Sequence, residues 1–245
     1  MWQAEFRDAR LVEVYDAECP WGRDDDWFSS VVGERPVRVL DLGCGTGRLT
    51  LGLARAGHTV TGVDPARASL SAARHKEGAS RVAWIEGTSA DLSADAFDVA
   101  VMTSHVAQVV TDDDQWARTL ADLHRSLVSG GRLAFDTRDP RARGWERWNP
   151  IESRREVALS DGRVVVVWTE VTAVEGATVV GFTHHYMFPD GHALESELTL
   201  RFRSEGEIRA SRDDAGFTVE QICGGWEGQP IGSADGELLV IARAR

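Results

Sequence analysis

Short apolar runs recur along the first half of the chain and alternate with segments of helical spacing. Five of these runs are predicted to form buried parallel strands, at residues 37–41, 59–63, 82–85, 99–102 and 133–135. Between the last two, residues 114–127 carry large apolar residues every three or four positions behind an acidic start, which predicts an amphipathic helix. Strands that alternate with helices predict an α/β fold with a doubly wound, Rossmann-like sheet.

The periodicity changes to two after about residue 150. Three further runs are expected to form antiparallel strands: residues 164–171 are β-branched and apolar, 179–188 are rich in aromatic residues, and 194–202 place their apolar residues on one face. The sequence Pro189-Asp190-Gly191 predicts a hairpin turn between the last two. We interpret these strands as an antiparallel β insertion that follows strand five of an enlarged core.

The two ends of the chain complete this plan. Residues 6–32 are predicted to contain a helix ahead of the core, and Ser204 with Glu207 forms a capping box that opens another helix. Two last runs, 217–222 and 237–241, bring the sheet to seven strands, with an antiparallel last strand. The expected parts are therefore an N-terminal lid segment with the ligand-binding core (1–149), the insertion as a substrate cover (150–203) and the C-terminal part of the core sheet (204–245).

Charge and cysteine usage narrow the class of partner. The chain has 39 Asp plus Glu against 27 Lys plus Arg, a net charge of -12, and such a polyanion repels nucleic acid. Its start lacks the basic and apolar runs of an export signal, and no stretch has the length needed to span a bilayer. The three cysteines show neither disulfide nor zinc spacing. We expect a cytoplasmic monomer or homodimer without nucleic acid, membrane or metal.

The strongest chemical signal follows the first predicted strand. Residues 39–47 read Val-Leu-Asp-Leu-Gly-Cys-Gly-Thr-Gly, and glycine lets a backbone adopt positive φ and approach a ligand closely. The second strand ends in Asp64, an acid placed to accept the hydroxyls of a ribose. A dinucleotide fingerprint requires its third glycine where this chain has Arg48, so the spacing disfavours NAD.

With its flanks, this run resembles the first motif of class I S-adenosylmethionine (AdoMet)-dependent methyltransferases. Three further segments are similar to signatures of the same family, in the family's order: 62–65, 97–100 and 127–133. The resemblance covers residues 37–136 firmly and the remainder loosely. It implies AdoMet as the cofactor.

The resemblance also implies a set of cofactor contacts. Asp41 is expected to order the glycine loop or a water near the cofactor amine, and Asp64 to bind the ribose. The family often has Gly-Asp where this chain has Gly87-Thr88, so the adenine contact is expected to move to the residues that follow. The expected cofactor-binding residues are Asp41, Gly43, Cys44, Gly45, Thr46, Gly47, Asp64, Pro65, Ser89, Ala90, Asp91, Leu92 and Thr103.

His105 is the candidate catalytic residue. It follows predicted strand four, and ligands of open α/β sheets bind at the carboxyl ends of the strands. A neutral imidazole beside the transferred methyl group could accept a proton from an amine or a hydroxyl. The alternative is that His105 orients the substrate or binds the loop.

Four further residues are expected at the acceptor. Tyr15 belongs to the N-terminal segment, which related enzymes use as a lid, and ordinary packing is its alternative role. Gln108 lies one helical turn beyond His105. Arg138 and Trp148 follow strand five, where a cluster of arginines either binds an anionic small molecule or forms a solvated loop.

These features predict methyl transfer to a small-molecule acceptor. The layout of the insertion is similar to that of sugar-amine and glycine N-methyltransferases, which favours N-methylation over O-methylation. A catalytic triad is not required, because a sulfonium cofactor brings its own leaving group and the protein mainly aligns and desolvates. The alternatives are a protein that binds AdoMet without turnover and, less favoured, an NAD-dependent oxidoreductase.

Overall fold

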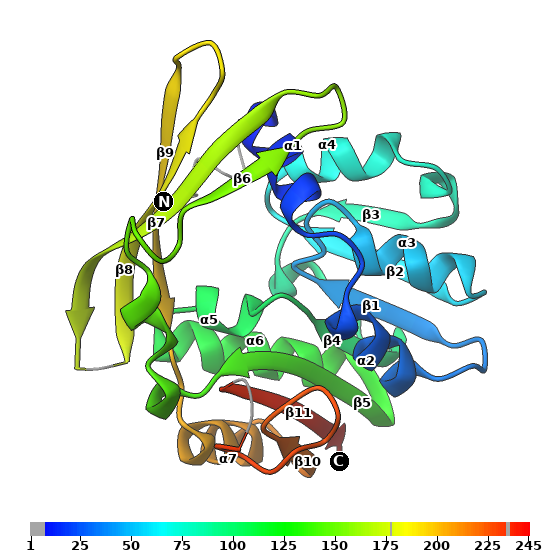
Figure 1. Cartoon of the computed structure of the whole chain (residues 1–245). Coiled ribbons are helices and arrows are strands. Elements are labelled where there is room, and N and C mark those ends of the chain that lie inside the picture. Colours follow the sequence, from blue (N-terminus) through cyan, green and yellow to red (C-terminus); the bar gives the residue numbers. More distant parts are fainter. Residues whose placement is uncertain (1–7, 177, 234–235) are drawn as a thin grey trace.

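A seven-stranded sheet forms the core of the protein (Figure 1). The computed structural model describes residues 8–176, 178–233 and 236–245. The strands of the core sheet, in spatial order, are β10 (Phe217–Cys223), β11 (Glu237–Ala244), β5 (Leu127–Arg138), β4 (Phe97–Met102), β1 (Arg38–Leu42), β2 (Thr59–Asp64) and β3 (Ala83–Glu86). The predicted doubly wound α/β sheet is confirmed.

Helices cover both faces of this sheet. The α-helices are α1 (Ala9–Glu18), α2 (Arg23–Val32), α3 (Arg48–Arg55), α4 (Arg67–His75), α5 (Val106–Val109), α6 (Asp113–Ser126) and α7 (Glu205–Asp214). Short 3₁₀ turns are η2 (Ala79–Arg81), η3 (Ser89–Asp91), η4 (Pro140–Ala142) and η5 (Gly144–Arg147). The predicted capping box is confirmed, because Ser204 Oγ accepts the Glu207 N–H at the start of α7.

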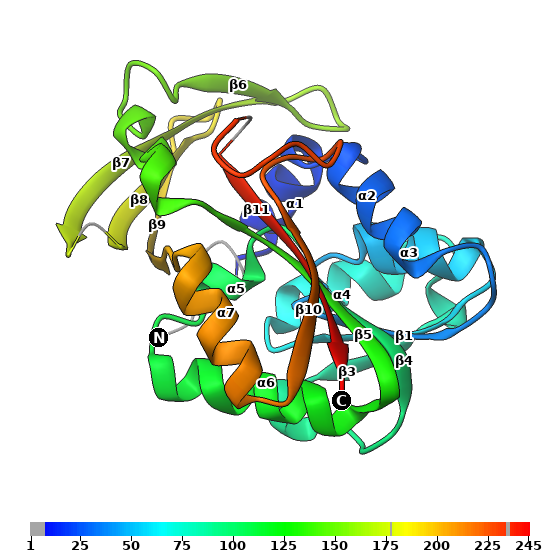
Figure 2. The same cartoon turned by 90° about the horizontal axis from the view of Figure 1, so that it is seen from below.

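Successive side chains of the central strands pack on opposite faces. Leu40 and Ala100 belong to a core cluster with α6 and α7, whereas Val39 and Val101 belong to a cluster with α2 and α3. Figure 2 shows α7 beside β10 and close to α6. The strands read as continuous apolar runs because both of their faces are buried.

Strand β11 is antiparallel to both of its neighbours, β5 and β10, so the expected antiparallel last strand is confirmed. It lies inside the sheet, and β10 forms the edge. The burial of the strands explains this order, because Leu238, Leu239 and Val240 are all fully buried, whereas β10 exposes residues such as Glu220.

The insertion is a separate antiparallel sheet of four strands. Its strands, in spatial order, are β6 (Arg155–Ala158), β7 (Val164–Glu175), β8 (Val179–Met187) and β9 (Ala193–Arg201). The three predicted strands are present, and the turn between β8 and β9 closes by a bond from Gly191 N–H to Phe188 O. Strand β6 was not predicted, because four residues with one buried side chain, Val157, give no periodic signal.

The N-terminal segment forms two helices, which corrects the single helix predicted over residues 6–32. Its first two residues lie outside the described part of the chain. Pro20, which has no N–H to donate, separates α1 from α2. The Asp25 carboxylate accepts the Gly22 N–H and caps α2. Leu11 and Val14 pack α1 against the insertion, and Figure 1 shows α1 between β6 and α4.

The fifth strand is also longer than predicted. Residues 133–135 were expected, and the observed strand β5 begins where α6 ends and continues to Arg138. Within the described ranges, none of the helices combines the length and the apolar character that a bilayer crossing requires.

Candidate active site

The glycine loop between β1 and α3 is packed against side chains at Gly43 and Gly47 and is open at Gly45. Gly43, Gly45 and Gly47 have φ of 78°, 52° and 81°, the left-handed region that favours glycine. A Cβ on Gly43 would lie 2.5 Å from Val106, and one on Gly47 would lie 2.6 Å from Trp84. A Cβ on Gly45 would meet nothing within 4 Å. The loop therefore leaves room for a ligand directly at Gly45.

Asp64 ties the end of β2 to this loop. Its Oδ2 accepts the Gly45 N–H at 2.8 Å, and its Oδ1 accepts the Ala66 N–H, beyond Pro65, at 2.7 Å. Burial raises the pKa of Asp64, and the two N–H donors oppose that rise. Because each carboxylate oxygen can accept more than one hydrogen bond, the side chain keeps capacity for the two hydroxyls of a ribose.

Asp41 places a buried carboxyl group beneath the loop. The Thr50 hydroxyl donates to Asp41 Oδ2 at 2.6 Å, whereas Oδ1 is buried without a partner in the described part of the chain. Burial raises the pKa of Asp41 to about 7. A buried carboxylate oxygen without a donor fits a cofactor that carries an amine, since such groups are normally paired.

The residues expected at the adenine lie in and behind η3. The Ser89 hydroxyl donates to Asp122 Oδ2 at 2.9 Å, on α6, and Asp91 accepts the Thr88 N–H at 2.8 Å. Both side chains therefore hold the turn itself. Ala90 is exposed and Leu92 is buried. Contact with adenine at this turn remains a prediction.

The N-terminal helices are bonded to the glycine loop. The Thr46 hydroxyl donates to Asp16 of α1. Lys76 Nζ lies 2.8 Å from Asp16 Oδ1 and 2.9 Å from Thr46 O, so one ammonium joins helix and loop. The expected residue Tyr15 precedes Asp16 and is half-buried. Sequence reasoning missed Asp16 and Lys76, because their partners are distant in the sequence.

Arg48 makes a second bond between these parts. Its guanidinium lies 2.5 Å from Asp24 Oδ2 and 3.1 Å from Asp25 Oδ1, both on α2. The residue that occupies the place of the third dinucleotide glycine therefore anchors the N-terminal segment.

His105 lies behind β4, as expected, but its ring is held by two acids. Its Nε2 lies 2.9 Å from Glu237 Oε2 and 3.3 Å from Asp136 Oδ2, and Asp136 also accepts the His105 N–H at 3.1 Å. Ser104 and His105 both have positive φ, 54° and 64°, a rare backbone that sets the direction of the ring. Nε2 must carry a proton to face two carboxylates, which leaves Nδ1 as the basic nitrogen.

The two acids lie at the same end of the sheet but on neighbouring strands of opposite direction. Asp136 lies near the carboxyl end of β5, whereas Glu237 is the first residue of the antiparallel neighbour and pairs with Arg138. Burial raises the pKa of Asp136, and the adjacent His105 opposes that rise. Asp136 could have been found in the sequence as an acid that follows a buried run, as Asp64 does. Glu237 gave no such signal.

The expected acceptor residues Gln108, Arg138 and Trp148 lie together beside this group. Arg138 Nη1 donates to Gln108 Oε1 at 3.1 Å, and its guanidinium lies 5.6 Å from the centre of the Trp148 ring. Burial lowers the pKa of Arg138. Gln108 is fully buried and supports the arginine. Another arginine of this cluster, Arg141, is exposed and pairs with the nearby Asp139.

A pocket of about 340 Å³ opens beside Arg138, Trp148 and Glu237. Its lining includes Arg23, Arg138, Arg147, Trp148 and Glu237. It combines cationic, anionic and aromatic groups next to His105, so it can hold a polar molecule of small size.

Asp136 and Glu237, together with His105, form a group of possible metal ligands. The donor atoms of His105, Asp136 and Glu237 all lie within 4.8 Å of one another. The spacing in the sequence predicted no metal, and the sheet brings together residues that are far apart along the chain. Their hydrogen bonds to one another already account for the arrangement.

Comparison with known proteins agrees with this geometry. The model of a methyltransferase domain family matches residues 39–131. A cypemycin N-terminal methyltransferase of a Streptomyces species is 30% identical, over 96% of this chain and 96% of that protein. A ubiquinone biosynthesis O-methyltransferase of Rhizobium leguminosarum is 35% identical over 54% of this chain and 51% of that protein.

The fold has solved counterparts as well. An S-adenosylmethionine-dependent methyltransferase from Clostridium acetobutylicum has a TM-score of 0.76 and 17% identity, and the match covers 96% of this chain and 98% of that one. Family model, full-length relative and fold agree with the open glycine loop and the acids at the ends of β1 and β2. The chain belongs to the AdoMet-dependent methyltransferases.

Proposed function

We propose that this enzyme methylates the nitrogen of an amine on a small molecule. One observation carries the proposal: His105 Nε2 faces Asp136 and Glu237, which lines the acceptor pocket, so Nδ1 is left as the base of this group. Nδ1 has no hydrogen-bond partner among the residues that the structure describes. An ammonium is attracted by the two carboxylates and must lose a proton before its nitrogen becomes a nucleophile.

Each group then has a defined task. When bound, AdoMet supplies an electrophilic methyl group and a neutral leaving group. Glu237 and Asp136 hold the His105 ring and attract the acceptor cation, and His105 Nδ1 accepts its proton. Trp148 supplies an aromatic wall, against which a cation or the acceptor's apolar part can lie.

On the cofactor side, the glycine loop approaches the ligand closely, Asp64 accepts the ribose hydroxyls and Asp41 balances the charge of the cofactor amine. Tyr15 and the bonds of Asp16 belong to a lid over the loop. Residues 150–203 act as the substrate cover. These assignments rest on the contacts described above and extend the family's cofactor mode to this chain.

N-methylation is favoured over O-methylation by the relatives. The relative that matches over the whole chain is named for methylation of an N-terminus, whereas the chain spans about half the length of the O-methyltransferases that it matches. A match over 96% of the chain therefore weighs more for the acceptor side than a match over 54% of it.

The test compares amines with alcohols of the same skeleton. Enzyme and AdoMet are incubated with such pairs, including alaninamide and lactamide, and the products are read by mass spectrometry. A mass gain of one methyl group on the amines alone supports the proposal. Methylation of the alcohols alone would transfer the assignment to oxygen. Calorimetric binding of AdoMet with no methylated product from any acceptor would favour a binding protein without turnover.

A further inference from the structure

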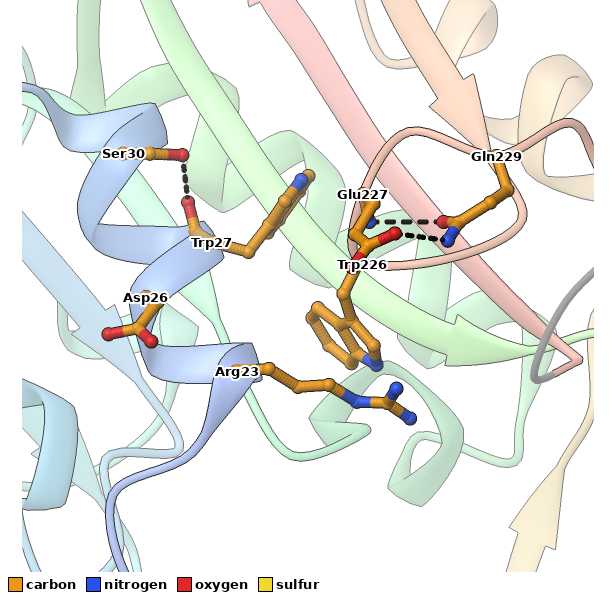
Figure 3. A pocket seen from close by; sticks show the side chains of 7 residues that line it. All are labelled: Arg23, Asp26, Trp27, Ser30, Trp226, Glu227 and Gln229. Atoms are coloured by element: carbon orange, nitrogen blue, oxygen red, sulfur yellow. Dashed lines mark hydrogen bonds between the residues drawn. The ribbon is translucent and has the colours of Figure 1, made fainter.

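A second pocket, of about 420 Å³, lies next to the acceptor pocket. Its walls are α2 and residues 226–229 of the loop that follows β10 (Figure 3). Arg23, the first residue of α2, lines both pockets, so they are neighbours. Apart from Arg23, its lining residues are shared neither with the acceptor pocket nor with the cofactor-binding residues named above.

Both walls of this pocket are fixed without a ligand. The ion pairs from Arg48 to Asp24 and Asp25 hold α2. The loop is closed by a bond from Gly224 N–H to Gln229 O at 2.7 Å, and the Gln229 side chain accepts the Glu227 N–H at 3.0 Å. A preformed pocket binds without the entropic cost of ordering its walls.

Two tryptophans give the pocket its chemistry. Trp27 and Trp226 meet edge to face, with ring centres 6.0 Å apart, and both are half-buried. Figure 3 shows Trp226 reaching from the loop towards α2, with Trp27 on one side and Arg23 on the other. In the described part of the chain, neither indole N–H has a hydrogen-bond partner, so each can donate to a ligand.

The acids of the pocket are directed elsewhere. Asp26 accepts the Trp21 indole N–H at 2.8 Å, and Glu227 is bonded to the Gln229 side-chain amide. Figure 3 shows Asp26 turned away from Trp226. What the pocket offers is therefore aromatic surface, N–H donors and the Arg23 guanidinium, which suit a flat ring with carbonyl oxygens near it.

The segment that connects β10 to β11 contributes residues to both pockets. The segment between β10 and β11 carries Trp226 at the second pocket and ends at Glu237, which faces His105. We propose that the second pocket binds the tail of the methyl acceptor. The acceptor is then an amine that carries a flat apolar ring, joined through carbonyl-bearing links, with the amine at Glu237 and the ring packed against Trp27 and Trp226. This inference rests on the proposed N-methylation.

The first test measures KM for peptide amides that place a ring at different distances from one amine. The probes are Ala-Trp, Ala-Gly-Trp and Ala-Gly-Gly-Trp amides, with alaninamide and Ala-Gly-Gly amide as ringless references. One of the tryptophan peptides should show a KM at least about tenfold lower than the references, with a similar kcat. Ser30→Tyr, which fills the pocket from an exposed position of α2, should remove that advantage and leave the references unchanged.

The control variant is Arg118→Tyr, which places the same side chain on an exposed position of α6 far along the chain from the pocket. It should behave as the wild-type enzyme does. Equal KM values for ringed and ringless probes, or an advantage that survives Ser30→Tyr, would overturn the tail site.

A second measurement separates this inference from the proposed function. N-acetyl-Gly-Trp amide has no amine to methylate, and its binding is followed by saturation-transfer NMR. Binding to the wild-type protein that is lost in Ser30→Tyr and kept in Arg118→Tyr supports the tail site even if no amine is methylated. Binding unaffected by Ser30→Tyr rejects the tail site even if amines are methylated.

Discussion

His105 and Glu237 are 132 positions apart in the sequence, yet His105 Nε2 lies 2.9 Å from Glu237 Oε2. The contact exists because β11 is antiparallel to β5 and therefore starts where β5 ends. It fixes which ring nitrogen carries the proton in the neutral imidazole. A carboxylate in this place orients the base and stabilises the cation that forms when the base accepts a proton.

The first prediction follows from this pair. His105→Ala should lower kcat about 100-fold, because proton transfer by a positioned base contributes that order of rate. Glu237→Gln keeps an oxygen that can accept from Nε2 and removes the charge, so its kcat should fall by a smaller factor, about tenfold. Steady-state kinetics would measure both. Neither variant should alter the calorimetric affinity for AdoMet, and wild-type turnover in both would exclude a role for the pair.

The second prediction concerns Asp64. Asp64→Ala should weaken AdoMet binding by about 1 to 3 kcal/mol, since it removes charge-assisted hydrogen bonds to the ribose. It also leaves the Gly45 N–H without its acceptor, which loosens the loop. Calorimetry would show the loss, with Asp161→Ala on the insertion as the control. A dissociation constant equal to that of the wild-type protein would remove Asp64 from the cofactor site.

The third prediction concerns the bond between the N-terminal helix and the glycine loop. Asp16→Ala removes the acceptor shared by Thr46 and Lys76. We expect α1 to separate from the loop more readily, so that AdoMet dissociates faster, by about three- to tenfold. Stopped-flow measurement of the dissociation rate would show this. Glu13→Ala, on the same helix but paired with Arg163 of the insertion, is the matched control. Equal dissociation rates for Asp16→Ala and the control would show that the bond does not retain the cofactor.

Features of the site that depend on one strand and the turn behind it could be predicted from the sequence. The glycine loop and Asp64 are of this kind, because each follows directly from a buried apolar run. The bond from Lys76 to Asp16 crosses 60 positions, and that from His105 to Glu237 crosses 132. Such contacts depend on how α1 crosses the loop and on the register of β11, and no local pattern records either.

His105 illustrates the same limit at a single residue. Its place at the carboxyl end of β4 was predictable, and the direction of its ring was not. That direction depends on the positive φ of Ser104 and His105 and on two acids from other strands. The location of a group is a property of the topology, whereas its protonation depends on the neighbours that the topology brings to it.

The last prediction uses Asp41, whose pKa burial raises from 3.8 to about 7. Between these values the folded state keeps a proton that the unfolded state has lost. The free energy of unfolding therefore falls as pH rises from about 4 to about 7. In an Asp41→Asn variant, the amide oxygen can still accept the Thr50 hydroxyl, and the side chain has no proton to lose. Relative to the wild-type protein, the variant should thus gain stability between pH 5 and pH 8, by up to about 3 kcal/mol.

Thermal unfolding of the cofactor-free proteins at pH 5 and pH 8 would measure this gain, which corresponds to several degrees in a chain of this size. Asp98→Asn is the control, because the hydrogen bond from Arg38 holds the pKa of Asp98 below its usual value. Asp98 stays charged across the whole range, so its variant should differ from the wild-type protein by the same amount at both pH values. If the Asp41→Asn difference were equally constant, Asp41 would be ionised at pH 5, and its raised pKa would be wrong.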